Sequence, residues 1–142
     1  MTDLLDINVW LALTDERHVH HAAATDYWET QAAEMTVFCR ITMLGFLRLV
    51  TQPGMANPPL SATRAWKVYR GYLQAPGVGF LQEPLGLDEQ LGRFLSRPHF
   101  HPRLWTDAYL SALAITSGSR LVSFDSDFQK FDGLDLLHLT AI

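Results

Sequence analysis

The sequence predicts an α/β fold with a mainly parallel central sheet of four or five strands and helices on both faces. Short apolar segments typical of strands alternate with helical patterns along the whole chain, and that alternation favours a parallel sheet. Two of the apolar segments end directly in carboxylates, Asp6 and Asp125. Because ligands of open parallel sheets bind beyond the carboxyl ends of the strands, these acids mark the expected functional edge.

The composition is that of an ordinary globular protein. The 142 residues are 48% hydrophobic and 18% charged, which predicts one domain over residues 1–142. No apolar run approaches the ~20 residues of a membrane span, and the N-terminal MTDLLDINVWLAL lacks the basic residues of a signal peptide. Cys39 is the only cysteine, which excludes an internal disulfide and is typical of the reducing cytoplasm. We therefore expect a cytoplasmic protein without membrane contact.

The net charge of −4 restricts how the chain can meet nucleic acid. An acidic protein must concentrate its positive charge locally or recruit cations to do so. Arg64, Lys67 and Arg70 share a broad sector of one predicted helix and, with Arg40 and Arg48, form a candidate RNA-binding patch. A solvated helix face explains the same charges.

The first half of the chain begins with the strand Asp3–Asp6, whose final carboxylate is either a ligand or the N-cap of the next helix. His18, His20 and His21 lack the cysteines or Glu-x-x-His pattern of a zinc site, so we interpret them as a loop and a helix entry. The further elements expected here are the helix Val9–Leu13, the helix His21–Glu34, the strand Thr36–Cys39, the helix Thr42–Thr51 capped by Thr42, the loop Met55–Pro59 and the helix Leu60–Leu73.

The second half is organised around the stretch Leu104–Phe128. Its helix starts at Leu104 and stops at Ser117-Gly118-Ser119, with Gly118 as the C-cap residue. Asp107 lies in the first turn of that helix, where the helix dipole favours a negative charge. The other expected elements are the strand Val78–Leu81, the helix Leu87–Leu95, the loop Ser96–Arg103, the strand Arg120–Phe124, the turn Phe128–Gly133 and the final strand Leu134–Leu139. In the loop, His99 and His101 are either merely exposed or touch a substrate.

Four of the fifteen acids are expected at strand ends or in a first helical turn, and the other eleven are assigned to helix surfaces, loops or the last strand. The four are Asp6, Asp107, Asp125 and Asp127. Carboxylates that converge repel one another unless they are protonated or share a cation. Oxygen ligands select Mg²⁺ or Mn²⁺, and such an ion assists the hydrolysis of a phosphodiester. No Ser-His-Asp order, phosphate-binding glycine loop or cysteine-centred motif competes with this interpretation.

Three motifs resemble those of PIN-domain ribonucleases, and most closely those of the VapC-type toxins of type II toxin–antitoxin pairs. They are LLDINVWLAL at the N-terminus, WTDAYLSALA in the late helix and LVSFDSDF at the fourth strand, and together they span nearly the whole chain. The resemblance implies a three-layer α/β/α sandwich and a Mg²⁺- or Mn²⁺-dependent endoribonuclease. It also implies a homodimer and a cognate VapB-type antitoxin that covers the site. The RNA substrate, for which tRNA and rRNA are candidates, is not specified by the sequence.

The resemblance also assigns roles to individual residues. A water activated by the ion is the implied nucleophile. Asp127 has an alternative role as the cap of the turn before Phe128. The implied catalytic acids are Asp6, Asp107 and Asp125, and the implied metal ligands are the same three with Asp127. Beyond the resemblance, we expect Asn8, Thr106 and Ser123 to orient these carboxylates, and an ordinary cap or turn role is the alternative for each.

One position departs from the family's pattern. In TMLGFLRLVT, Met43 stands where many members carry an acid, and a thioether is a poor ligand for Mg²⁺. We expect Met43→Glu to raise the affinity for Mn²⁺. Unchanged affinity in calorimetry would indicate that Met43 faces away from the site.

Two other functions fit the same residues. The missing acid at Met43 also suits a non-catalytic PIN-like module that binds RNA or a protein, and metal-dependent RNA cleavage separates this function from the first. A phosphoacceptor domain also uses acids and Mg²⁺ at strand ends. That class needs a lysine at a late strand end, whereas Lys130 lies in a predicted turn.

Overall fold

A computed structural model describes residues 1–98 and 100–142, so the two alternatives for His99, exposure or contact with a substrate, lie outside the described residues. These residues form five strands, which are β1 (Thr2–Leu5), β2 (Met35–Phe38), β3 (Val78–Phe80), β4 (Arg120–Ser123) and β5 (Leu136–His138). They also form six α-helices, which are α1 (Ile7–Thr14), α2 (His21–Thr30), α3 (Arg40–Thr51), α4 (Ala62–Gln74), α5 (Leu87–Phe94) and α6 (Trp105–Ser117), and two short 3₁₀ helices, η1 (Pro102–Leu104) and η2 (Ser126–Lys130). No helix in the described part is long and apolar enough to cross a membrane.

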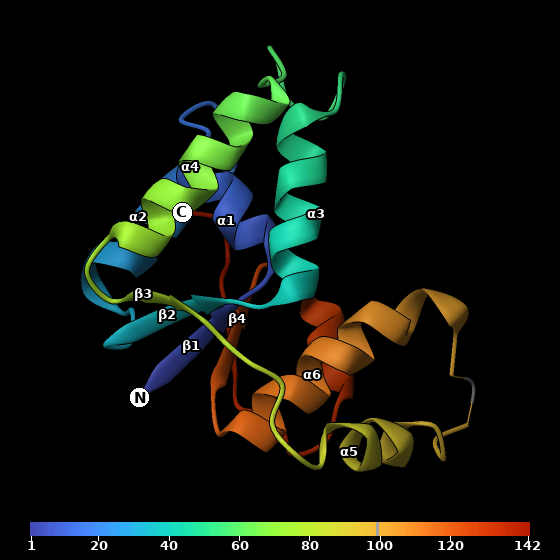
Figure 1. Cartoon of the computed structure of the whole chain (residues 1–142). Coiled ribbons are helices and arrows are strands. Elements are labelled where there is room, and N and C mark those ends of the chain that lie inside the picture. Colours follow the sequence, from blue (N-terminus) through green and yellow to red (C-terminus); the bar gives the residue numbers. More distant parts are fainter. Residues whose placement is uncertain (99) are drawn as a thin grey trace.

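The strands form one sheet in the order β3-β2-β1-β4-β5, and every pairing is parallel. The α/β class with a parallel central sheet is therefore confirmed. Figure 1 shows helices α1, α2, α3 and α4 on one side of this sheet and α5 and α6 on the other. The molecule thus has the three-layer arrangement that the resemblance implies.

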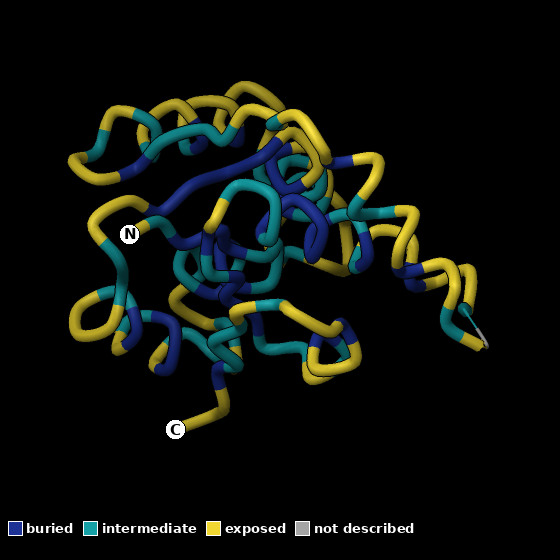
Figure 2. Tube along the Cα trace, turned by 90° about the horizontal axis from the view of Figure 1, so that it is seen from below, coloured by how far each residue is buried: buried dark blue, intermediate teal, exposed yellow. Residues whose placement is uncertain are grey.

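The two cores follow from the alternation of side chains along each strand. Leu4 and Leu121 belong to the core under α5 and α6, whereas Leu5 and Val122, one residue further along each strand, belong to the core under α1, α3 and α4. Successive side chains of a strand point to opposite faces of the sheet. Figure 2 shows the buried stretches gathered inside the trace and the outer helical turns exposed.

The order of the strands creates a crevice between β1 and β4. From β1 the chain moves outward to β2 and β3 on one side, and then returns through α5 and α6 to place β4 and β5 on the other side of β1. Such a reversal leaves an opening at the carboxyl ends of the two central strands. Residues that follow β1 and β4 therefore meet at one edge.

At the opposite edge, a buried ion pair joins β1 to β4. Asp3 is fully buried and accepts hydrogen bonds from Nε and Nη2 of Arg120 at 2.8 and 2.9 Å. The Tyr27 hydroxyl and the Ala33 backbone N–H donate to the same carboxylate. The expectation that acids outside the four chosen ones lie on helix surfaces, in loops or in the last strand is therefore wrong for Asp3.

Several predicted boundaries also need correction: α1 begins two residues earlier than predicted, α4 begins two residues later, and β5 is confined to Leu136–His138. Helix α3 begins at Arg40 with Cys39 as its N-cap residue, because the Thr42 hydroxyl accepts from the Cys39 N–H at 2.9 Å from within the first turn; Thr42 is thus not the N-cap. Helix α2 ends at Thr30 rather than Glu34. The late helix α6 begins at Trp105, one residue after the predicted start, because η1 precedes it.

Other local predictions are confirmed. Asp6 is the N-cap of α1, since its side chain accepts from the Ile7 N–H. Gly118 ends α6 with a φ of 68°, a left-handed conformation that favours glycine. At Gly45 the backbone of α3 comes so close to α1 that a Cβ there would overlap the Ile7 side chain. This close approach holds α1, and with it Asp6, against α3.

Candidate metal centre

Three carboxylates converge at the carboxyl edge of the sheet. Asp107 comes from the first turn of α6, whereas Asp125 and Asp127 follow β4 as the N-cap and first turn of η2. One carboxylate oxygen from each residue lies within 4.8 Å of those of the other two. All three are half-buried. Among the described residues, this is the one cluster of acids, histidines or cysteines with such geometry, so the histidines His18, His20 and His21 take no part in one.

Hydrogen bonds fix the turn after β4. The Asp125 carboxylate accepts from the Asp127 N–H at 2.8 Å, which makes Asp125 the cap of η2. The alternative that Asp127 caps this turn is therefore wrong. The side chain of Asp127 instead lies 3.1 Å from the ammonium group of Lys130. Asp127 is thus left facing Asp107 and Lys130.

Asp6 lies beside this cluster with both of its oxygens engaged. One accepts from the Ile7 N–H at 2.8 Å and the other from the Ser123 hydroxyl at 2.7 Å. The register explains the second bond: Leu5 pairs with Val122, so the next residues on the two strands, Asp6 and Ser123, are neighbours. Asp6 is not one of the three residues whose carboxylate oxygens lie within 4.8 Å of one another.

Ser123 and Asn8 form the hydrogen-bonded support of these acids. The fully buried Ser123 hydroxyl donates to Asp6 and accepts from the Asp125 N–H at 2.9 Å. Asn8 donates to the same hydroxyl at 3.3 Å and accepts from the Phe124 N–H. Thr106 is exposed, and no hydrogen bond joins it to an acid in the described part of the chain. Of the three polar residues singled out from sequence, Ser123 therefore contacts Asp6 and Asp125 directly, and Asn8 acts on them through Ser123 and Phe124.

The electrostatics of the site disfavour negative charge. Burial raises the pKa of Asp107 to about 6, and the neighbouring carboxylates Asp6, Asp125 and Asp127 add to the effect. Burial also raises the pKa of Asp6, with a further contribution from Asp125, although the Ser123 and Ile7 hydrogen bonds oppose it. Because burial and mutual repulsion disfavour the ionised carboxylates, a bound cation would stabilise them in their charged form.

Met43 packs into the apolar core at the start of α3. It is buried in the cluster that contains Leu5 and Phe46, and its sulfur lies 4.0 Å from Nη1 of Arg40. Arg40 in turn covers the ring of Phe80, at the end of β3. The start of α3 thus presents a cation beside Met43, where the family pattern has an acid.

The basic residues chosen from sequence are spread over α3 and α4. Arg48 lines a shallow hollow with Trp66, and Arg64 and Lys67 are exposed on α4. The cations closest to the acids are different ones: Arg103 lowers the pKa of Asp107 by its charge, and Lys130 contacts Asp127. The sequence offered a signal for Lys130, which follows Asp127 by one 3₁₀ turn.

The comparisons with known proteins agree with this geometry. The family described as PIN domain matches residues 4–134. Ribonuclease VapC41 of Mycobacterium tuberculosis is 37% identical over 94% of this chain and 95% of its own length.

Solved structures show the same fold. VapC20 of Mycobacterium tuberculosis, described as a sarcin–ricin loop cleaving toxin, superposes with a TM-score of 0.64 at 18% identity, over 89% of this chain and 92% of VapC20. A toxin–antitoxin complex from Klebsiella pneumoniae contains a chain that superposes with a TM-score of 0.69 at 15% identity, over 99% of both chains. With a matching family, a relative of high coverage and a shared fold, this chain belongs to the PIN-domain family and to its VapC type.

Proposed function

We propose that this protein is a divalent-metal-dependent endoribonuclease and the toxin of a toxin–antitoxin pair. The observation that carries the proposal is the convergence of Asp107, Asp125 and Asp127 within 4.8 Å at the crevice between β1 and β4. The relatives support the reaction class, because VapC41 and several further matches are named ribonucleases. The carboxylate oxygens of these acids support the proposed divalent metal ion.

The residues present fit Mg²⁺ or Mn²⁺. All the available donors are carboxylate oxygens, which hard divalent cations prefer. Burial and the neighbouring carboxylates raise the pKa of Asp107, and a bound cation would favour its ionised form against both effects. In such a site the ion makes a bound water more acidic and neutralises charge on a phosphoryl oxygen. We assign the binding of the ion to Asp107, Asp125 and Asp127, with Asp6 as the fourth acid.

The chain's own groups have distinct tasks in this proposal. Asp107, on the rigid helix α6, holds its position independently of the turn that carries Asp125 and Asp127. Ser123 orients Asp6, and Asn8 orients Ser123, so that the β1 and β4 ends keep a fixed separation. Asp6, Asp107 and Asp125 are the proposed catalytic residues.

The proposed partners follow from the relatives. Several solved neighbours are toxin–antitoxin complexes, such as VapBC-1 of nontypeable Haemophilus influenzae, so we propose a VapB-type antitoxin that covers the acids. The substrate is RNA, with tRNA and rRNA as candidates. A homodimer, a cytoplasmic location and a single domain over residues 1–142 complete the proposal, and the candidate RNA contacts Arg40, Arg48, Arg64 and Lys67 remain part of it.

The test is the cleavage of a mixed pool of structured RNA by the purified chain with Mg²⁺ or Mn²⁺. We expect the wild type to cut, and the Asp107→Asn variant and an EDTA control to be inactive. Asp26→Asn makes the same change on the exposed face of α2 and should retain full activity. Cleavage that survives both EDTA and Asp107→Asn would contradict the proposal. Inactivity of the wild type together with an absence of Mn²⁺ binding would favour a non-catalytic RNA- or protein-binding module.

A further inference from the structure

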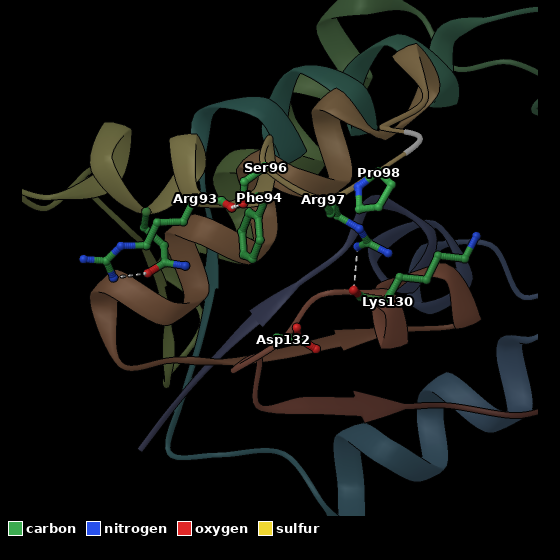
Figure 3. A pocket seen from close by; sticks show the side chains of 8 residues that line it. Arg93, Phe94, Ser96, Arg97, Pro98, Lys130 and Asp132 are labelled. Atoms are coloured by element: carbon green, nitrogen blue, oxygen red, sulfur yellow. Dashed lines mark hydrogen bonds between the residues drawn. The ribbon is translucent and has the colours of Figure 1, made fainter.

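A cleft lies between the end of α5 and the η2 segment (Figure 3). We call it the α5–η2 cleft. Its volume is about 660 Å³, within the roughly 300–1,000 Å³ of ligand pockets. Its charged lining consists of three cations and one acid, which are Arg93, Arg97, Lys130 and Asp132. In a chain of net charge −4, this is a local concentration of positive charge.

Arg97 is held in place by its surroundings. Its Nη1 donates to the Lys130 backbone carbonyl at 2.5 Å, a bond visible in Figure 3. Its guanidinium lies 5.6 Å from the centre of the Phe131 ring. Among the described residues no other hydrogen bond engages this guanidinium, so further N–H donors of a fixed, planar fork remain for a ligand. Such a fork matches the oxygens of a phosphate.

Lys130 connects the cleft to the acids. Its side chain lines the cleft, its carbonyl accepts from Arg97, and its ammonium group lies 3.1 Å from the Asp127 carboxylate. Arg97, Lys130 and Asp127 thus form a continuous path from the cleft to the candidate metal centre.

Arg93 adds charge at the outer end of the cleft. It pairs with Glu89 at 3.4 Å on the surface of α5, with both side chains largely exposed. An exposed pair of this kind contributes little, so a phosphate displaces it at small cost. Arg48, Arg64 and Lys67 have no comparable position, because they lie on α3 and α4, on the other side of the sheet.

We propose that the α5–η2 cleft binds a backbone phosphate of the RNA strand next to the bond that is cut, with Arg97 as its main contact and Lys130 and Arg93 beside it. This inference rests on the proposed function for the identity of the strand. It makes these three cations positioning residues, which hold the RNA so that its neighbouring phosphodiester meets the acids. The cleft is thereby assigned to substrate binding and the acids to the reaction.

Fluorescence anisotropy of a labelled, mixed-sequence single-stranded RNA tests the cleft directly. The full chain is titrated in EDTA, so binding is measured without cleavage. We expect Arg97→Gln to weaken binding about tenfold, as for a lost charge-assisted hydrogen bond, and to reduce the slope of log K against log salt by roughly 0.7 per lost contact. The RNA affinity of Arg97→Lys should lie between those of the wild type and Arg97→Gln, since lysine keeps the positive charge but lacks the planar fork of N–H donors. Arg17→Gln is the matched control, an exposed arginine between α1 and α2, and should bind as the wild type does.

Competitors identify the ligand. Unlabelled RNA should displace the probe, whereas inorganic phosphate or poly-L-glutamate at the same total charge should not. Equal displacement by phosphate would assign the cleft to the free anion, and equal displacement by poly-L-glutamate would assign it to an acidic protein segment; either result overturns the proposal. The proposal is also overturned if the wild type binds no RNA, or if Arg97→Gln and Arg17→Gln weaken RNA binding equally.

Different experiments can refute the proposed RNA binding in the cleft and the proposed RNA cleavage. If Arg97→Gln weakens RNA binding but the wild type cuts no RNA with Mg²⁺ or Mn²⁺, the cleft stands and the nuclease does not. If the wild type cuts RNA and Arg97→Gln leaves both binding and KM unchanged, the nuclease stands and the cleft does not. Where both hold, Arg97→Gln raises KM more than it lowers kcat.

Discussion

At the scale of single residues, the geometry of the candidate centre depends on Ser123. This buried hydroxyl donates to Asp6, accepts from the backbone N–H of Asp125 and accepts from Asn8. It therefore ties the acid after β1 to the turn after β4. Neither acid would keep its position against the other by backbone geometry alone, because the turn after β4 carries no strand pairing.

Ser123→Ala tests this dependence. We expect it to weaken Mn²⁺ binding and to lower the cleavage rate by roughly 10–100-fold, as for other residues that orient metal ligands. Ser123→Thr keeps the hydroxyl and should restore most of the loss. Calorimetry with Mn²⁺ measures the affinity, and circular dichroism shows whether the fold is kept. An alanine variant with wild-type affinity would show that Asp6 needs no such support.

The raised pKa of Asp107 predicts how the metal-free protein responds to pH. Its value of about 6 in the folded protein exceeds the ordinary 3.8, so between these values the folded state binds more protons than the unfolded state. The stability contributed by this group is therefore full below about pH 4 and falls as the pH rises through 6. Asp107→Asn should raise the melting temperature at pH 7.5 by a few degrees, on the order of 2–5 °C. The gain should disappear near pH 4.

Melting curves in EDTA at pH 7.5 and pH 4 measure this difference. Asp26→Asn, the exposed control on α2, should change neither curve. Equal melting temperatures of wild type and Asp107→Asn at pH 7.5 would mean that burial and the neighbouring carboxylates do not disfavour the ionised form of Asp107 in the folded protein.

The sequence predicted part of this residue-scale picture. Asp107, Asp125 and Asp127 were chosen as acids at strand ends or in a first helical turn, and the structure brings these three together. Spacing along the chain does not reveal hydrogen-bond direction, so it could not show that Asp125 caps η2 or that both oxygens of Asp6 are engaged. Met43→Glu remains predicted to raise Mn²⁺ affinity, with Arg40 close enough to compete for the new carboxylate.

At the scale of elements, β1 and β4 have different tasks at their two ends. Their carboxyl ends carry the acids, and their amino ends are joined by the Asp3–Arg120 pair. Asp3 is completely buried, and the Arg120 side chain keeps an exposed fraction of 20%. Removal of one partner of a buried pair leaves the other charge uncompensated. The amino-terminal end thus stabilises the pairing that positions the acids.

Arg120→Met is expected to lower the free energy of unfolding by roughly 3–5 kcal/mol. Tyr27→Phe removes only the hydroxyl that donates to Asp3 at 2.6 Å and should cost about 1.5–3 kcal/mol. Urea unfolding measures both. Because this network lies at the opposite end of β1 from Asp6, the folded Tyr27→Phe variant should keep the wild-type affinity for Mn²⁺. A changed Mn²⁺ affinity would show that the two ends of the strands are coupled.

Most elements could be predicted from periodicity and capping residues, and the failures have physical causes. The sequence predicts the start of α3 two residues too late because threonine is a good N-cap residue, whereas the Thr42 hydroxyl accepts from the Cys39 N–H from the third helical position. The sequence predicts α2 four residues too long because residues 31–34 contain no glycine or proline that would end a helix. The chain turns there because the buried Asp3 carboxylate binds the Ala33 N–H, a contact between residues distant in sequence.

At the scale of the whole molecule, the strand order decides where chemistry can occur. The strand order reverses between β1 and β4, the acids gather at that reversal, and the α5–η2 cleft adjoins them through the contact of Lys130 with Asp127. The predicted α/β class needed only the alternation of elements. The position of the basic cleft needed the folded chain, because Arg97 and Lys130 are 33 residues apart and meet only through a backbone carbonyl.

The measurement that tests the central claim most directly is the fate of oxygen in the cleaved RNA. RNA is cut by the wild type in H₂¹⁸O with Mn²⁺, and the new terminal phosphate is analysed by mass spectrometry beside Asp107→Asn. If the acids direct a water at the phosphodiester, the terminal phosphate carries one ¹⁸O for each bond cut, and the variant yields no product. A 2′,3′-cyclic phosphate without ¹⁸O, formed equally by the variant, would contradict the account.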